Sequence, residues 1–199
     1  MSSGNLETRN RILNAAWKLL EAHQGKSVRM TDIAKQAGIS RQAVYLHFKT
    51  RSELLIATTR YIDEVKDVDA RLVPSRTAEN GAEGLDAFID AWCNYIPEIY
   101  GVVKALLAMK DTDEAAAIAW NDRMQAVRHG CEAAIKRLDS DGTLSPDHTI
   151  EQATDILWTM LSVRNWEQLT MECGWPLTTY IEKIKSLARH IFVASATQR

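Results

Sequence analysis

Long hydrogen-bonding side chains gather between residues 41 and 51, in the segment RQAVYLHFKTR. Arg41 and Gln42 are of the types that form paired hydrogen bonds with guanine and adenine edges, while Tyr45 and His47 can reach a base or a phosphate. These residue types favour recognition of double-stranded DNA. A solvated helix face carries similar residues, and that alternative stays open.

Positive charge and a helix start follow directly. Lys49 and Arg51 are cationic, and Thr50 with Glu53 has the spacing of a capping box for a new helix. The backbone N–H groups of such a helix start can hold a phosphate. This segment therefore extends the candidate DNA surface from base edges to the backbone.

Two short helices must position these side chains. Thr31 is placed to cap the first helix, Gly38 to end it, and Ser40 to cap the second. The apolar faces consist of Ile33, Ala34 and Ala37, then Ala43, Val44 and Phe48. Two helices joined by a short turn that contains glycine predict a helix-turn-helix. An ordinary αα-corner shares this pattern.

The segment resembles the DNA-binding domain of the TetR family of transcriptional regulators. That family's pattern runs from T-x-x-I-A-x-x-A-G-(V/I)-S to Y-x-H-F-x-x-(K/R)-x-x-L-L. The matching residues here are Thr31, Ile33, Ala34, Ala37, Gly38, Ile39, Ser40, Tyr45, His47, Phe48, Arg51, Leu54 and Leu55. Arg51 stands where lysine is commoner, which keeps the charge but changes the donor geometry.

The resemblance implies an all-α fold in two domains. Residues 1–52 would form a three-helix helix-turn-helix DNA-binding domain. A long helix would join it to a helical effector-binding and dimerisation domain over residues 53–199. The residues expected to contact DNA are Thr31, Ser40, Arg41, Gln42, Ala43, Tyr45, His47, Lys49 and Arg51.

Charge is divided unevenly along the chain of 199 residues. Residues 1–52 carry nine Lys or Arg against three Asp or Glu, a formal charge of +6, and the remainder carries 15 against 23, or −8. A basic module on an acidic body suits a protein that presents one end to a polyanion. We expect its affinity for DNA to fall with salt.

Composition excludes several other classes. The sequence has no apolar run of eighteen residues and no secretory signal, so we expect neither a membrane partner nor export. Cys93, Cys131 and Cys173 are odd in number and widely spaced, which favours buried thiols in a reducing cytoplasm.

Helical periodicity predicts the other elements. Residues 1–5 are expected to be disordered. A first helix is expected from residue 7 to about residue 22, with its end near Gly25. The helix that Thr50 opens runs to about Leu72, and residues 74–84 read as a loop. Further helices are expected up to Pro97, over 102–109 and 117–138, from Ser145–Pro146 onward, and over 180–191.

In the TetR family, which this chain resembles, the last two helices pair with those of a second copy of the chain. The helices before them enclose an effector. A homodimer would place two reading helices over half-sites about one helical turn apart. The predicted effector pocket comprises Trp92, Tyr95, Tyr100, Trp120, Met124 and Trp158. The predicted dimer interface comprises Leu157, Leu161, Arg164, Ile184, Leu187 and Ile191. Each of these residues could instead complete the core of one chain.

Enzyme and metal motifs are missing from the sequence. The five histidines show no HExxH spacing, and neither a phosphate-binding glycine loop nor a G-x-S-x-G elbow occurs. We expect no catalysis, cofactor or metal.

The leading interpretation is a ligand-responsive regulator, most often a repressor in this family, that binds an operator as a homodimer. The alternative is an all-α ligand-binding or protein-interaction module without operator binding.

Overall fold

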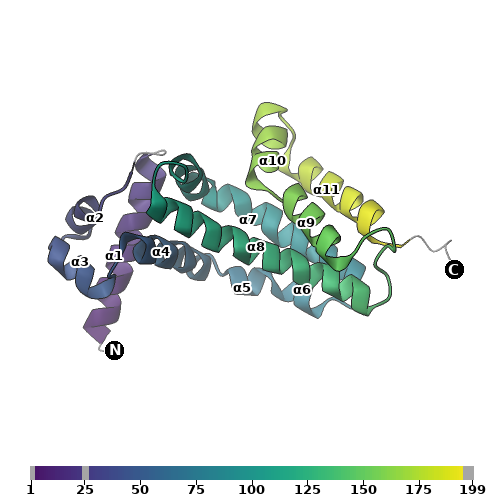
Figure 1. The fold of residues 1–199 in the computed structure, drawn as a ribbon, viewed down its shortest axis with the longest axis horizontal. Helices are drawn as coiled ribbons and strands as arrows, with labels where there is room; N and C mark the ends of the chain where they lie inside the picture. Colours follow the sequence, from purple (N-terminus) through teal and green to yellow (C-terminus); the bar gives the residue numbers. More distant parts are fainter. Residues whose placement is uncertain (1–2, 24–26, 195–199) are drawn as a thin grey trace. The chain divides into compact units, whose positions relative to one another are not determined.

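The computed structural model describes residues 3–23 and 27–194, and it confirms the predicted all-α class (Figure 1). The only β pairing among these residues is a single bridge between Leu144 and Val193. The elements are α1 (Ser3–His23), α2 (Met30–Ala37), α3 (Arg41–His47), α4 (Arg51–Val65), α5 (Val68–Arg71), α6 (Val73–Thr77), α7 (Gly81–Met109), α8 (Glu114–Ser140), α9 (Ile150–Met160), α10 (Val163–Glu167), a π-helical turn (Gln168–Glu172) and α11 (Leu177–Phe192).

The chain forms two compact units. One comprises residues 1–68 and 99–124, and the other comprises residues 69–98 and 125–199. Helices α7 and α8 each contribute to both units, so the units do not follow the predicted boundary at residue 52. A division of functions at that boundary stays a prediction.

The amino-terminal unit is built around one apolar core. Helix α1 packs against α2 and α4, and α2 packs against α3, which agrees with the predicted three-helix domain. The ends of α7 and α8 complete the same core. Its largest fully buried side chains are Ile12, Leu20, Ile33, Phe48, Leu54, Leu55 and Leu106. The helix-turn-helix is therefore not stabilised by its own residues alone.

Two predicted details at the amino terminus are wrong. Helix α1 already includes residues 3–5, whereas Met1, Ser2 and Gly25 lie outside the described residues. Thr31 does not cap α2, because the helix begins at Met30 with Arg29 in the cap position. The Asp32 carboxylate accepts a hydrogen bond from the Arg29 N–H at 3.3 Å, and the Met30 side chain is buried.

The connecting helix is shorter than predicted. Helix α4 ends at Val65, and Asp67 takes a left-handed conformation with φ of 52°. Aspartate tolerates this conformation better than most residues, so it can interrupt a helix without glycine. Val65 is about half exposed, which shows that apolar spacing beyond Ile62 does not mark a continuous buried face.

The predicted loop over residues 74–84 is largely helical. Pro74 lies in the first turn of α6, where its missing N–H costs nothing. Helix α7 starts at Gly81, where a Cβ atom would lie 2.9 Å from the Leu138 backbone. This glycine allows close helix packing, and the Asn80 side chain accepts a hydrogen bond from the Glu83 N–H at 3.0 Å. Pro74, Asn80 and Gly81, which suggested a loop, therefore lie at the starts of helices.

Pro97 does not end its helix. Helix α7 continues through it to Met109 and so includes the separately predicted segment 102–109. A proline removes one backbone hydrogen bond, but Ile96 and Val102 on either side are buried, which keeps the helix continuous.

Later boundaries are mixed. The long predicted helix over 117–138 is confirmed as α8. The predicted start at Ser145–Pro146 is wrong, because α9 begins at Ile150 with a capping box between Thr149 and Gln152. The Ser145 N–H instead donates to the Phe192 carbonyl at the end of α11, 2.8 Å away.

Ion pairs and apolar packing hold α11 in the second unit. Arg189 donates to both Asp86 oxygens at 2.9 and 2.7 Å, and Lys185 donates to Asp90 at 2.6 Å. The buried face of α11 consists of Tyr180, Ile181, Ile184, Ala188 and Phe192. Helix α11 is therefore fixed to α7 on one face.

The cysteines follow the prediction in two positions of three. Cys93 and Cys131 are buried free thiols, and burial raises the pKa of each to about 12, which makes them poor nucleophiles. Cys173 is exposed, against the expectation of burial. It lies beside Gly174, whose positive φ places this segment in a turn.

Across residues 3–23 and 27–194, no helix combines the length and apolarity needed to cross a bilayer. The same residues contain no cluster of histidine, cysteine and carboxylate side chains arranged to hold a metal ion.

Candidate nucleic-acid interface

The turn between α2 and α3 is formed by the predicted residues. Gly38 has φ of 66° and ψ of 35°, and the Ile39 N–H donates to the Ala34 carbonyl at 3.0 Å. The Ser40 side chain accepts from the Ala43 N–H at 3.1 Å and so caps α3. Left-handed glycine followed by a serine cap sets the direction in which α3 leaves the turn.

One face of α3 is anchored in the core. Val44 and Phe48 are completely buried. The Arg9 guanidinium of α1 lies 4.3 Å from the centre of the Phe48 ring, a favourable cation–π contact. The short helix is thus held by its apolar side chains, and its orientation does not depend on its outward residues.

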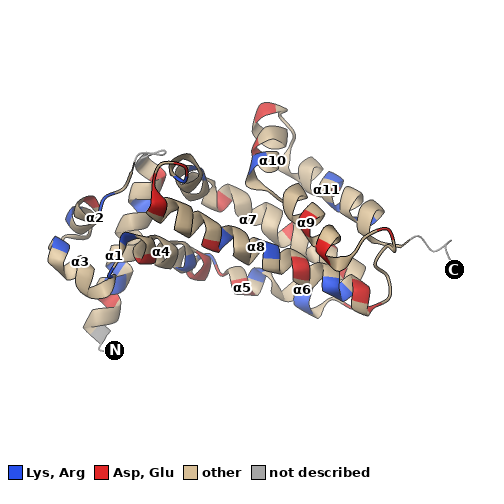
Figure 2. Ribbon diagram, in the orientation of Figure 1, with Lys and Arg blue, Asp and Glu red and all other residues tan. Residues whose placement is uncertain are grey.

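The opposite face of α3 is polar and open. Arg41, Gln42 and Tyr45 are exposed, as the sequence predicts for residues that read base edges. The Arg41 Nη2 atom lies 3.4 Å from the Tyr45 hydroxyl, and its guanidinium lies 5.5 Å from the ring centre. This contact pre-orders two of the longest side chains on the face. Figure 2 shows Lys and Arg on α1, α2 and α3.

The start of α4 adds a second set of exposed groups. Thr50 accepts from the Glu53 N–H at 3.1 Å, as a capping residue should. The Glu53 carboxylate accepts from the Lys49 N–H at 2.8 Å, one residue earlier than an ideal capping box. This bond directs the backbone at Lys49, and the Lys49 side chain is exposed.

Arg51 is placed differently from the other predicted DNA contacts. Its Nη1 atom donates to both Asp113 oxygens at 2.6 and 2.7 Å, and its Nε donates to the Val28 carbonyl at 2.6 Å. Its side chain is only 20% exposed. Protein partners therefore occupy the Nε and Nη1 atoms of this guanidinium, and Nη2 is buried without a hydrogen-bond partner, unlike the exposed ends of Gln42 and Lys49.

Asp113 is the centre of this cluster. Besides Arg51, it accepts from the Ser27 hydroxyl at 3.0 Å and from the Ala116 N–H at 3.2 Å. Burial raises the pKa of the Asp113 carboxyl, but the hydrogen bonds from Arg51, Ala116 and Ser27 outweigh burial, so this pKa lies below its ordinary value of 3.8. One carboxylate thus joins the starts of α4 and α8 to the segment before α2.

The remaining predicted contacts divide by exposure. Thr31 is exposed on α2, whereas Ala43 and His47 are half-buried on α3. Sequence reasoning missed Leu46, which is 83% exposed on the outward face of α3. Its position, four residues after Gln42, is the signal that could have placed it there.

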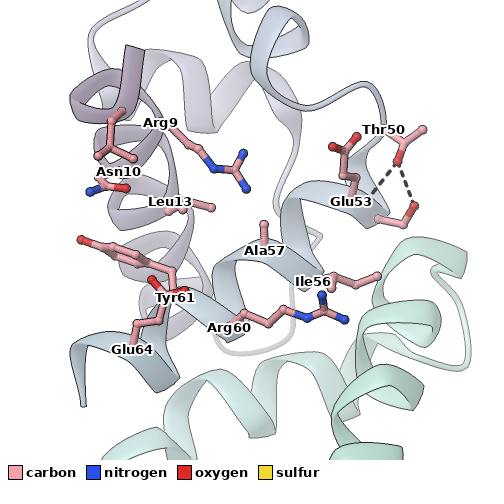
Figure 3. Close-up of a pocket in the computed structure, with 12 residues that line it drawn as sticks. Arg9, Asn10, Leu13, Thr50, Glu53, Ile56, Ala57, Arg60, Tyr61 and Glu64 are labelled. Carbon is pink, nitrogen blue, oxygen red and sulfur yellow. Dashed lines mark hydrogen bonds between the residues drawn. The ribbon is translucent and has the colours of Figure 1, made fainter. Parts of the chain in front are cut away.

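A hollow of about 700 Å³ lies between α1 and α4 within the amino-terminal unit (Figure 3). Figure 3 shows the Arg9 guanidinium directed into it from α1, with Glu53 and Arg60 contributed by α4. Its floor includes Leu13 and Ala57. Because Thr50 and Ser52 line one end, the hollow adjoins the capped start of α4.

The predicted effector-pocket residues do not line this hollow. In the second unit, Trp92 donates its Nε1–H to the Leu161 carbonyl at 2.8 Å and meets Tyr95 edge-on at 6.3 Å, while Trp158 is half-buried. In the amino-terminal unit, Tyr100, Trp120 and Met124 are half-buried, and Trp120 packs on the core. Their role in binding an effector stays a prediction.

The predicted dimer residues also differ in exposure. Leu157, Leu161 and Ile184 are buried within the chain, so they offer almost no surface to a partner. Arg164 is exposed, Leu187 is 51% exposed, and Ile191 is half-buried. Of the predicted set, a partner chain could therefore contact Arg164, Leu187 and Ile191.

A second helix that is capped by Ser40 and anchored by Val44 and Phe48, within a three-helix domain, defines a helix-turn-helix. Residues 12–58 match the sequence family described as "Bacterial regulatory proteins, tetR family". This part of the chain therefore carries the helix-turn-helix domain of the TetR family of transcriptional regulators.

Individual relatives agree with this assignment. The HTH-type transcriptional regulator AcrR of Shigella flexneri is 44% identical over 48 residues, which cover 24% of this chain and 22% of AcrR. The match therefore spans less than a quarter of that relative.

Solved structures extend the likeness to the whole fold. A TetR-family transcriptional regulator from Rhodococcus sp. aligns with a TM-score of 0.72 at 20% identity, covering 93% of this chain and 98% of that one. NalD of Pseudomonas aeruginosa, described as the secondary repressor of the MexAB-OprM multidrug efflux pump, aligns with a TM-score of 0.68 at 19% identity, covering 98% and 100%. At these identities the likeness concerns the fold.

Proposed function

We propose that this chain binds operator DNA as a homodimer and represses transcription until a small-molecule effector releases it. The observation that carries the proposal is the outward face of α3, where Arg41, Gln42 and Tyr45 are exposed on a helix anchored by buried Val44 and Phe48. Such a face can enter the major groove without rearrangement of the core. We assign the DNA-reading function to residues 1–52. We place the protein in the cytoplasm.

Within this surface, we assign two kinds of role. Arg41 and Gln42 read base edges, and Lys49 with the capped start of α4 contacts phosphates. Arg51 supports the surface from within, because Asp113 and Val28 already occupy its guanidinium. The formal charge of +6 in residues 1–52 supports phosphate binding by this end of the chain.

A selection from randomised duplexes tests DNA recognition directly. The full chain, incubated with a random duplex library at moderate salt, is expected to enrich a palindromic sequence with two half-sites. Affinity for the enriched duplex should exceed that for scrambled duplexes by roughly a thousandfold or more. Enrichment of no sequence would contradict operator binding and favour the interaction-module alternative.

The dimer is proposed to form through the exposed part of α11. Leu187 is 51% exposed, and half-buried Ile191 follows one turn later, so these two offer apolar surface that Leu157 and Ile184 do not. An isologous interface would use each residue twice. Helix α11 is fixed to α7 by Arg189 and Lys185, which makes this face a rigid one.

Leu187→Glu is therefore expected to weaken dimerisation by roughly a hundredfold or more, because two apolar contacts are lost and two charges are introduced. Light scattering at micromolar concentration should give twice the chain mass for the unmodified protein and the single-chain mass for the variant. Ile118→Glu, at a 42% exposed position on α8, should leave the mass unchanged. A monomeric unmodified protein would rule out this interface.

The proposed effector acts in the helical part beyond residue 52. Trp92 and Trp158 are half-buried and supply aromatic surface there, with Tyr95 buried beside Trp92, and pockets for small organic molecules are mostly apolar and aromatic. Release from DNA requires that the effector bind the DNA-incompetent state more tightly than the competent one. The description of NalD as a repressor supports the proposed sign of regulation.

A further inference from the structure

Leu46 is the most exposed large apolar side chain among the described residues, at 83%. It lies one residue before the end of α3, where burial of Val44 and Phe48 already satisfies the core. Leaving a leucine in water forgoes the favourable free energy of its burial. Its position is therefore not explained by the stability of the single chain.

The surroundings of Leu46 indicate the chemistry of its partner. Gln42 lies one turn earlier on the same helix face, and Arg41 and Tyr45 flank it with polar groups that contact each other. Lys49 follows three residues later and is exposed. An apolar protein surface would leave these polar ends unpaired, whereas DNA offers hydrogen-bond acceptors and negative charge around them.

Within the major groove, one apolar group is available to such a side chain. The 5-methyl group of thymine projects into the groove, and the other base edges present donors and acceptors. We propose that Leu46 contacts a thymine methyl group next to the base pair that Gln42 reads, and so makes the protein select an A·T pair at that position. This inference rests on the proposed operator binding.

The test removes only the methyl group. In the duplex enriched by the full chain, each thymine is replaced in turn by deoxyuridine, in both half-sites together. Pairing is unchanged, so any loss reports the methyl contact. At one thymine per half-site, affinity is expected to fall roughly three- to five-fold for each methyl lost. At the other thymines the change should be smaller than twofold.

A variant then connects this thymine to Leu46. Leu46→Ala should bind the thymine and deoxyuridine duplexes equally well, because it has no side chain to reach the methyl group. Its thermal unfolding should match that of the unmodified chain, since the position is exposed. Ile118→Ala, which also shortens an exposed apolar side chain, should keep the full sensitivity to deoxyuridine.

The outcomes separate the inference from the proposed function. Enrichment of no duplex would contradict operator binding itself. An enriched duplex that tolerates deoxyuridine at every thymine would overturn the role of Leu46 alone. The role of Leu46 would also be overturned if Leu46→Ala remained as sensitive to deoxyuridine as the unmodified chain. A changed oligomeric mass for Leu46→Ala would overturn it too, and would assign Leu46 to a contact between protein copies.

Discussion

Replacement of Asp113 by alanine is expected to lower the free energy of unfolding by about 3 kcal/mol. The substitution leaves the largely buried Arg51 guanidinium without its carboxylate partner. It also removes the acceptor for the Ser27 hydroxyl and the Ala116 N–H. An unpaired buried charge costs more than the pair contributes, which is why the expected loss is large.

Urea unfolding would measure this effect against a neighbouring control. Asp111→Ala removes a carboxylate that is 78% exposed and paired with Lys110, so its expected loss is at most about 1 kcal/mol. Combining Asp113→Ala with Arg51→Met should recover part of the stability, because the buried charge is removed as well. Equal losses for Asp111→Ala and Asp113→Ala would contradict the proposed importance of the cluster.

The same carboxylate implies a pH dependence. Its pKa is lower in the folded chain than its ordinary value of 3.8, so protonation favours the unfolded state. The stabilisation is present above about pH 4 and is lost as the pH falls through the folded-state pKa. The difference in stability between the unmodified chain and Asp113→Ala should therefore shrink below pH 4.

The second large effect concerns DNA affinity. Gln42→Ala is expected to cost roughly 1 to 3 kcal/mol on the preferred duplex and to relax selectivity at one base position per half-site. Lys49→Ala should weaken all duplexes similarly and reduce the salt slope by about 1, because one phosphate contact is lost. Both side chains are exposed, so neither substitution should alter folding.

Gel-shift titrations at several salt concentrations, with the enriched duplex and single-base variants of it, would measure both effects. Arg51→Ala provides the contrast, since it should lower stability while leaving the salt slope nearly unchanged. A change in base preference for Lys49→Ala, without one for Gln42→Ala, would reverse the assigned roles.

Local signals account for the parts that the sequence predicts well. Gly38 and Ser40 act through their own backbone neighbours, and both take the predicted geometry. The buried residues Val44 and Phe48 follow helical spacing within one short element. For the same reason, the all-α class and helix α8 are predicted correctly, because long periodic stretches carry their own evidence.

Long-range contacts explain what local patterns miss. Arg51 looks like a phosphate ligand from its neighbours, but its partner Asp113 lies 62 residues away. The burial of Leu157, Leu161 and Ile184 depends on how helices of the second unit pack, which spacing alone does not reveal. The boundary error at Pro97 likewise reflects burial of the flanking residues, which outweighs the helix-breaking preference of proline.

Helix α3 is anchored by Val44, Phe48 and Arg9, which are different residues from the outward side chains proposed to contact DNA. Its outward side chains can be exchanged without opening a cavity or breaking a buried hydrogen bond. With the proposed operator binding, single surface substitutions would therefore be enough for natural divergence to produce new operator preferences. The same property makes this chain a suitable scaffold for retargeting, in which a recognition surface is rewritten on an unchanged frame.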